Sequence, residues 1–77
     1  MNNAMNLVER LTSREADVLA CIDRGMRNRE AAFLLGVSEN TVKFHLRNIY
    51  GKLGVDSRLD AVRMHRGREL AGIDQIS

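Results

Sequence analysis

The 77 residues are 44% hydrophobic and 29% charged, a composition typical of one compact domain with little room for an enclosed catalytic cavity. The net charge is only +2, but between Arg24 and Arg58 the chain has seven Lys or Arg against three Asp or Glu. The single cysteine, Cys21, excludes an intrachain disulfide, and the longest nearly apolar run, Ala31 to Val37, is too short to cross a bilayer. We therefore expect a soluble, cytoplasmic binding module without a cofactor, rather than an enzyme.

The first helix is predicted from a capping box. Residues 1–10 have no clean hydrophobic periodicity and are interpreted as a lead-in or the remnant of a linker. Thr12 is followed three residues later by Glu15, a spacing that satisfies two backbone amides at a helix start. The helix should run from about Ser13 to Arg24, because Gly25 is suited to end it.

Two further helices are predicted around a glycine. Asn28 is a favourable N-cap for a short second helix that ends before Gly36. Ser38 is placed to cap a third helix from about Glu39 to Leu53. Two helices joined by about three residues around a glycine are typical of a helix-turn-helix motif.

A fourth helix should begin after Ser57, with Asp60 in its first turn, and end near Arg66. Residues 67–77 contain two glycines and mixed polar residues, so we expect a weakly ordered tail there. The predicted fold is all-α, a compact four-helix domain over residues 11–66 with a central helix-turn-helix.

The predicted third helix has two distinct faces at 100° per residue. One face is an aliphatic stripe, which should be the core seam: Val42, Leu46, Ile49 and Leu53. The opposite face is polar and cationic with one aromatic side chain: Asn40, Lys43, Phe44 and Arg47. The second face suits a DNA major groove, which accommodates one α-helix and offers acceptors to Arg and Lys.

Within that face, Lys43 and Arg47 are the candidates to contact base edges, and Phe44 is suited to a thymine methyl group. Phosphate or groove-edge contacts are expected from polar and cationic residues nearby: Arg29, Asn40, Thr41, Lys52 and Arg58. Two alternatives remain open. Lys43 and Arg47 can form an ordinary solvated helix face, and Phe44 can pack on the lead-in or the tail.

No catalytic or metal site is predicted. Only His65 is available to join His45 as a ligand, and no acidic cluster shares its face, so a structural histidine at the core edge is expected. Cys21 lies beside the apolar stripe of the first helix and is interpreted as a small buried hydrophobe. The capping position of Ser38 accounts for that residue.

Many of these residues recur in a known pattern. The matching segments are Leu11-Thr12-Ser13-Arg14-Glu15, Val18-Leu19, Gly25, Asn28-Arg29-Glu30-Ala31-Ala32, Leu35, Val37-Ser38-Glu39, Thr41-Val42-Lys43, His45-Leu46, Asn48-Ile49, Lys52-Leu53-Gly54-Val55, Ser57-Arg58 and Ala61-Val62. Together they resemble the LuxR/FixJ-type helix-turn-helix domain of bacterial transcription regulators, over about residues 11–66.

The resemblance implies base contacts by the residues that follow the Thr-Val and His-Leu pairs, here Lys43, Phe44 and Arg47. It also implies a homodimer on DNA through the fourth helix, with four candidate interface residues: Leu59, Val62, Arg63 and Arg66. For Leu59 and Val62 a partly buried position against the first helix is the competing interpretation. An upstream regulatory domain in a longer parent chain is also implied.

The chain departs from the family at Ala31, where a larger aliphatic residue is common. Phe33 or Leu34 is expected to refill that volume. The function expected is sequence-specific binding of double-stranded DNA. The alternatives are a promoter-reading module similar to the C-terminal region of a sigma factor and a protein-interaction module without significant DNA affinity.

Overall fold

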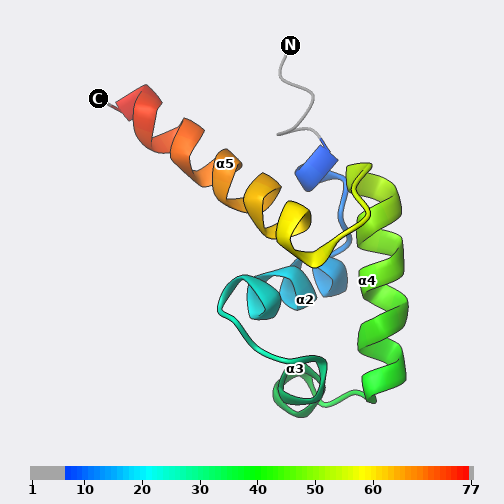
Figure 1. Cartoon of the computed structure of the whole chain (residues 1–77). Coiled ribbons are helices and arrows are strands. Elements are labelled where there is room, and N and C mark those ends of the chain that lie inside the picture. Colours follow the sequence, from blue (N-terminus) through cyan, green and yellow to red (C-terminus); the bar gives the residue numbers. More distant parts are fainter. Residues whose placement is uncertain (1–6, 77) are drawn as a thin grey trace.

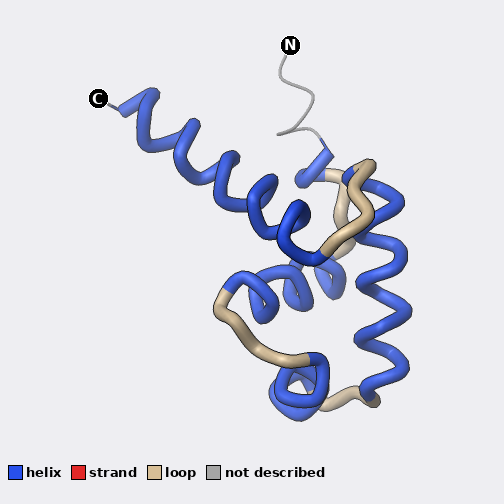
Figure 2. Tube along the Cα trace, in the orientation of Figure 1, coloured by secondary structure: helices blue, strands red, loops and turns tan. Residues whose placement is uncertain are grey.

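The computed structural model describes the backbone of residues 7–76 and the side chains of residues 7–67, and this part of the chain contains helices and turns but no strand. The helices are α2 (Ser13–Asp23), α3 (Asn28–Leu35), α4 (Glu39–Leu53) and α5 (Arg58–Ile76). In Figure 1, α2 lies in the middle, with α3 below it, α4 along one side and α5 crossing above. Figure 2 shows that short loops join them. The predicted all-α fold with a central helix-turn-helix is confirmed.

Helix α2 begins with the predicted capping box. The backbone amide of Glu15 donates to Thr12 Oγ1 at 3.1 Å, and the amide of Thr12 donates to Glu15 Oε1 at 2.9 Å. Both donors lack an intrahelical partner, so the two residues complete the first turn. The helix ends at Asp23, one residue before the predicted end.

The predicted N-cap of α3 is wrong by one residue. Arg27 is the N-cap, and its backbone amide donates to Glu30 Oε1 at 2.8 Å. Asn28 is the first helical residue, and its side-chain oxygen accepts a hydrogen bond from Arg58 Nη1 at 3.2 Å. Because Glu30 satisfies the cap from within the helix, the Asn28 side chain is available for a tertiary contact.

The turn between α3 and α4 is closed at Gly36, which has a φ of +71° that an L side chain would strain to adopt. The amide of Val37 donates to Ala32 O at 3.0 Å, the six-to-one bond of a Schellman motif. Ser38 then caps α4, since Ser38 Oγ accepts from the amide of Thr41 at 3.0 Å. These local bonds set the direction in which α4 leaves the turn.

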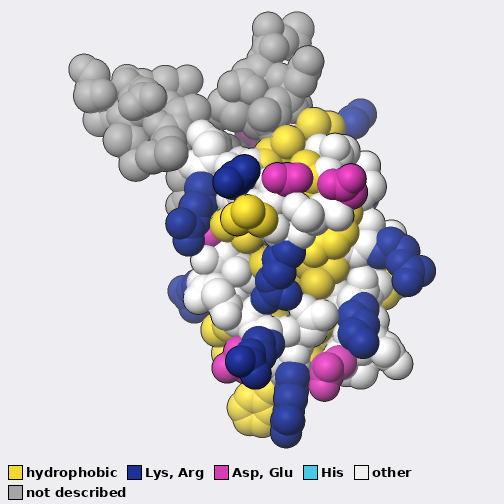
Figure 3. Space-filling view, in the orientation of Figure 1, with side chains coloured by type: hydrophobic (Ala, Val, Ile, Leu, Met, Phe, Trp, Pro, Cys, Tyr) yellow, Lys and Arg dark blue, Asp and Glu magenta, His cyan; other side chains and the backbone are white. Residues whose placement is uncertain are grey.

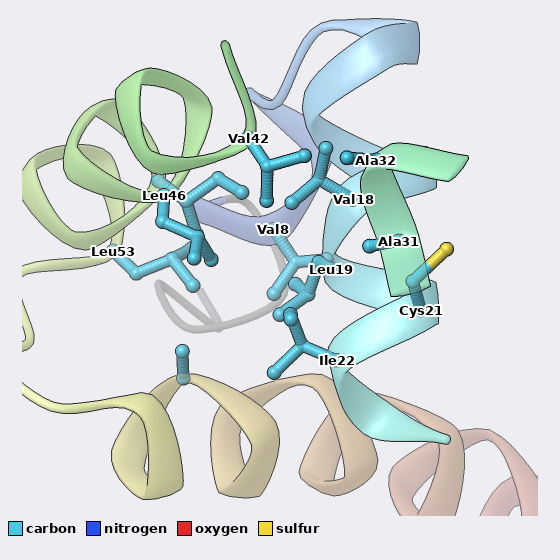
Figure 4. Close-up of a cluster of buried hydrophobic side chains, with 12 residues drawn as sticks. Val8, Val18, Leu19, Cys21, Ile22, Ala31, Ala32, Val42, Leu46 and Leu53 are labelled. Atoms are coloured by element: carbon cyan, nitrogen blue, oxygen red, sulfur yellow. The ribbon is translucent and has the colours of Figure 1, made fainter. Parts of the chain in front are cut away.

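The core lies between α2, α3, α4 and α5. Figure 4 shows aliphatic side chains from these helices pointing toward one another. The buried hydrophobic residues are Val8, Val18, Leu19, Cys21, Ile22, Ala31, Ala32, Val42, Leu46, Ile49, Leu53 and Ala61. The predicted burial of Cys21 is therefore confirmed, and the α4 seam is the largest aliphatic contribution from one helix.

The lead-in contributes to this core. Residues 7–9 form a helical turn, and Val8 is 9% exposed and belongs to the core cluster. Val8 therefore packs with the domain, the interpretation of residues 1–10 as a lead-in or linker remnant stays a prediction, and residues 1–6 lie outside the described part. A single buried Val in a segment without periodicity gives no sequence signal.

The expected refilling of the Ala31 position by Phe33 or Leu34 is also wrong. Ala31 is fully buried, whereas Phe33 is 90% exposed and Leu34 is 57% exposed. In an eight-residue helix whose buried face is formed by Ala31, Ala32 and the partly buried Leu35, the two intervening residues point outward. Small side chains at the contact let α3 approach its neighbours closely instead.

Helix α5 extends beyond its predicted end near Arg66 and reaches Ile76. A glycine within a helix costs only about 1 kcal/mol relative to alanine, so Gly67 does not end it. The chain contains no proline that would do so. The weak order predicted for residues 67–77 stays a prediction, because the side chains beyond Gly67 lie outside the described residues. The predicted start of α5 is confirmed, because the amide of Asp60 donates to Ser57 Oγ at 3.2 Å.

Candidate nucleic-acid interface

The two faces of α4 are separated as predicted. Val42, Leu46, Ile49 and Leu53 are all buried. The polar strip is exposed along its length: Asn40, Lys43, Phe44 and Arg47. Because the buried stripe holds the helix rotationally against α2 and α3, the cationic strip is presented on one continuous outer surface.

Phe44 is 59% exposed and does not fill the core. Its ring lies 5.9 Å from the ring of half-buried His45, measured between centroids, with the planes tilted by 60°. Tilted aromatic pairs of this separation are mutually favourable. The alternative in which Phe44 packs on the lead-in does not hold for the described residues. His45 is half-buried, and its expected role as a structural histidine stays a prediction.

The start of α4 is a second part of the candidate interface. Thr41 Oγ1 lies 2.9 Å from Ser38 Oγ, and Asn40 is exposed beside this pair. Backbone amides at a helix N-terminus and the helix dipole favour an anion such as a phosphate. Arg29 is exposed at the start of α3, which precedes the same turn.

Two predicted phosphate contacts have partners within the domain. Lys52 Nζ lies 2.7 Å from Glu15 Oε1. The Arg58 guanidinium donates to the Asn28 side chain and to the backbone oxygen of Met26. Lys52 thus joins the C-terminal half of α4 to the start of α2, and Arg58 joins α5 to the loop before α3.

The Lys52 contact reveals a role for Glu15 that the sequence did not indicate. One buried carboxylate oxygen, Oε1, accepts from both the Thr12 amide and Lys52 Nζ. Burial raises the pKa of Glu15, but the hydrogen bonds from Lys52 and Thr12 outweigh burial and lower the pKa below its ordinary value of 4.5. No local pattern connects residues 37 positions apart, so only the tertiary structure shows this tie.

The four candidate dimer residues on α5 are in different environments. Leu59 is 58% exposed, Arg63 is exposed, and Val62 is half-buried against the core. Arg66 Nε lies 2.5 Å from Asp23 Oδ1, and its Nη2 donates to Asp23 O at 3.1 Å. The Arg66 hydrogen bond is the largest cause of a lowered pKa at Asp23, and His65 adds to it.

The sequence profile described as bacterial regulatory proteins of the luxR family matches residues 9–65, most of the chain. This range contains the helix-turn-helix and the exposed strip of α4. The chain belongs to the LuxR family. It therefore forms a LuxR/FixJ-type helix-turn-helix DNA-binding domain of bacterial transcription regulators, as the resemblance implied.

Three relatives of this LuxR-family chain illustrate the match. The probable transcriptional regulatory protein SgaR of Hyphomicrobium methylovorum is 48% identical over 58 residues, 75% of this chain and 28% of the relative. The transcriptional regulatory protein YdfI of Bacillus subtilis (strain 168) is 45% identical over 64 residues, which are 83% of this chain and 30% of the relative. The nitrate/nitrite response regulator protein NarP of Escherichia coli (strain K12) is 49% identical over 51 residues, which are 66% of this chain and 24% of the relative.

The LuxR-family chain thus spans less than a third of the length of these curated relatives. No solved structure matched it. None of the helices in the described part is long and apolar enough to span a membrane. Within the described residues, His, Cys, Asp and Glu side chains form no group of three that is arranged to hold a metal ion.

Proposed function

We propose that this LuxR-family domain inserts α4 into the major groove of double-stranded DNA, with Lys43, Phe44 and Arg47 on the base edges. The observation that carries the proposal is the division of α4, whose aliphatic stripe is buried while the cationic strip is exposed. An Arg pairs with the two acceptors of guanine, a Lys reaches the same acceptors, and an aromatic side chain covers a thymine methyl group.

Phosphates flanking the groove would be bound from the ends of the helices around the turn. Exposed Arg29, exposed Asn40 and the hydroxyl of Thr41 belong to this group, together with the first amides of α4. Lys52 and Arg58 have internal partners, and we assign them a smaller contribution through the positive potential that they add to this side of the domain.

We further propose that the domain binds DNA as a homodimer through α5, with Leu59, Val62, Arg63 and Arg66 at the interface. Exposed Leu59 and half-buried Val62 are three positions apart and share one face of the helix. Two copies would place their α4 helices on half-sites separated by about one turn of DNA. Such a regulator acts in the cytoplasm, and the length of the relatives supports an upstream regulatory domain in a longer parent chain.

The test is charge reversal on the strip, using duplexes selected by the wild-type domain from a random pool. The double variant Lys43→Glu with Arg47→Glu should lose binding by at least about 2 kcal/mol, because two base contacts worth about 1–3 kcal/mol each are reversed. The matched control is Arg10→Glu with Arg24→Glu, which changes the net charge equally at exposed residues outside α4.

Thermal unfolding followed by circular dichroism should be unchanged in both double variants. If the control loses affinity as much as the strip variant, the strip does not read DNA and only net charge matters. If the wild-type domain shows no salt-dependent binding to any duplex, the protein-interaction alternative is correct instead.

A further inference from the structure

The outer face of α3 carries two large apolar side chains that the core does not use. Phe33 is 90% exposed and Leu34 is 57% exposed, whereas Ala31 and Ala32 make the buried contact. Half-buried Met26 lies beside them in the loop before α3. An exposed patch of this kind on a small soluble domain is typical of an interaction site, because it gains nothing for folding and lowers solubility.

These side chains border a shallow groove over α2 and α3. One hollow of about 510 Å³ is lined by Met26, Arg29, Glu30, Phe33 and Leu34. A second hollow of about 200 Å³ continues from Leu34 and Leu35 to the α2 residues Asp17, Ala20 and Cys21, and to Arg24, which follows α2. Leu34 belongs to both hollows, and no residue of α4 lines either of them. An occupant of the groove would therefore leave the outer strip of α4 uncovered.

The arginine side chains around this groove outnumber the carboxylates beside them. Arg24, Arg27 and Arg29 are exposed, and they make no ion pair with the described residues. Of the two carboxylates nearby, Glu30 accepts a hydrogen bond from the Arg27 amide and keeps its charge, and Asp17 lies 3.8 Å from Arg14 Nη1, so the guanidinium groups still leave this surface with a net positive charge. In Figure 3 a hydrophobic side chain protrudes at the bottom of the molecule, where α3 lies, with Lys or Arg side chains close to it.

We propose that this groove, lined by Met26, Phe33 and Leu34 and flanked by the three arginines, docks an acidic amphipathic segment of another protein. Apolar side chains of that segment cover Phe33 and Leu34, and its carboxylates pair with the guanidinium groups. Aromatic and Arg side chains are the residues that most often dominate binding at such surfaces. Arg29 is the one groove residue that is also among the proposed phosphate contacts, and no residue of the α4 strip lines the groove, so the inference stands without base contacts by α4.

The probe is a fluorescein-labelled synthetic helical peptide with leucine at every third or fourth position and glutamate on the other face. Its anisotropy is measured against the full chain, and a matched peptide has lysine in place of glutamate. The expected result is that Phe33→Ala weakens binding of the glutamate peptide by about tenfold or more. The matched control Phe44→Ala, the same change on α4, should weaken it less than about twofold.

Backbone amide shifts in nuclear magnetic resonance spectra should move over residues 26–34 on adding the glutamate peptide and should stay constant over 40–47. Thermal unfolding of each variant checks that Phe33→Ala is folded, and an exposed residue outside the core leaves the midpoint unchanged. A Phe33→Asn variant provides a second, equally exposed substitution.

Three results would overturn the proposal. The first is equal binding of the glutamate and lysine peptides, and the second is a shift map centred on α4, which would mean that the peptide only imitates DNA. The third is concentration-dependent self-association in sedimentation that Phe33→Ala abolishes, which would assign the patch to a second copy of this chain. Failure of the domain to bind DNA would leave all three measurements interpretable.

Discussion

The inner and outer faces of α4 differ in what holds them in place. Val42, Leu46, Ile49 and Leu53 contact side chains of the domain itself, whereas Lys43, Phe44 and Arg47 are exposed. Under the proposed function, stability and recognition belong to different residues of one 15-residue helix. Variants of the inner face should alter folding, and variants of the outer face should alter binding alone.

The largest effect is expected from the inner face. Ile49 is fully buried, and Ile49→Ala should lower the free energy of unfolding by about 2–5 kcal/mol, because both the transfer energy of the side chain and the filled volume are lost. Urea denaturation measures the change as a shift of the midpoint, provided that the dependence of the free energy on urea concentration has the same slope in both proteins. A loss below about 1 kcal/mol would contradict the buried seam. Phe44→Ala is the control, with little expected change.

On the outer face, Arg47→Ala should weaken binding to a selected duplex by about 1–3 kcal/mol and relax specificity at one base position. The free energy of unfolding should change by less than about 0.5 kcal/mol, because the Arg47 side chain is exposed. Binding is measured by anisotropy against duplexes varied at each position in turn. A uniform loss over all duplexes would indicate that Arg47 contacts a phosphate rather than a base.

Arg58 tests whether a cation belongs to the fold or to the binding surface. Arg58→Met keeps the apolar stem but removes the donors to Asn28 and to the Met26 carbonyl. The free energy of unfolding should therefore fall by about 1–3 kcal/mol. The salt dependence of DNA binding should hardly change. Exposed Arg29 is the control, since Arg29→Met should reduce the salt slope by about one unit and leave stability nearly unchanged.

The smallest expected change in the free energy of unfolding at neutral pH, which becomes larger in acid, comes from the two α2 carboxylates that bond other parts of the domain. Glu15 and Asp23 have pKa values below their ordinary values of 4.5 and 3.8. As pH falls below about 4.5, the unfolded chain therefore binds protons first, and the free energy of unfolding decreases until the lowered pKa values are passed. Above that window the stabilisation from both groups is fully present.

Glu15→Gln keeps the capping geometry but removes the titrating charge, so the loss of stability between pH 5 and pH 3 should be shallower than in the wild type. Urea midpoints across this range measure it. Glu39→Gln, an exposed carboxylate on α4 without an ion pair among the described residues, is the control. An identical acid profile for Glu15→Gln and the wild type would contradict the lowered pKa of Glu15.

Local patterns predicted the parts of the fold that local physics decides. The capping box at Thr12, the left-handed turn at Gly36 and the cap at Ser38 each depend on residues within a few positions of one another. The bounds of α4 follow from the Ser38 cap and the left-handed Gly54, and its two faces follow from helical periodicity. The predicted end of α5 was wrong because a glycine is only a weak stop signal when no proline follows and the flanking residues favour a helix.

The sequence by itself determined the all-α class, the helix-turn-helix and the identity of the exposed strip of α4, because these depend on caps, turn residues and periodicity. Only the tertiary structure decided that Val8 enters the core, that Lys52 and Arg58 are engaged with Glu15, Asn28 and Met26, and that Phe33 stays outside. These outcomes depend on which distant surfaces meet. A charged or apolar side chain has the same local signature whether its partner is water, DNA or a residue more than thirty positions away.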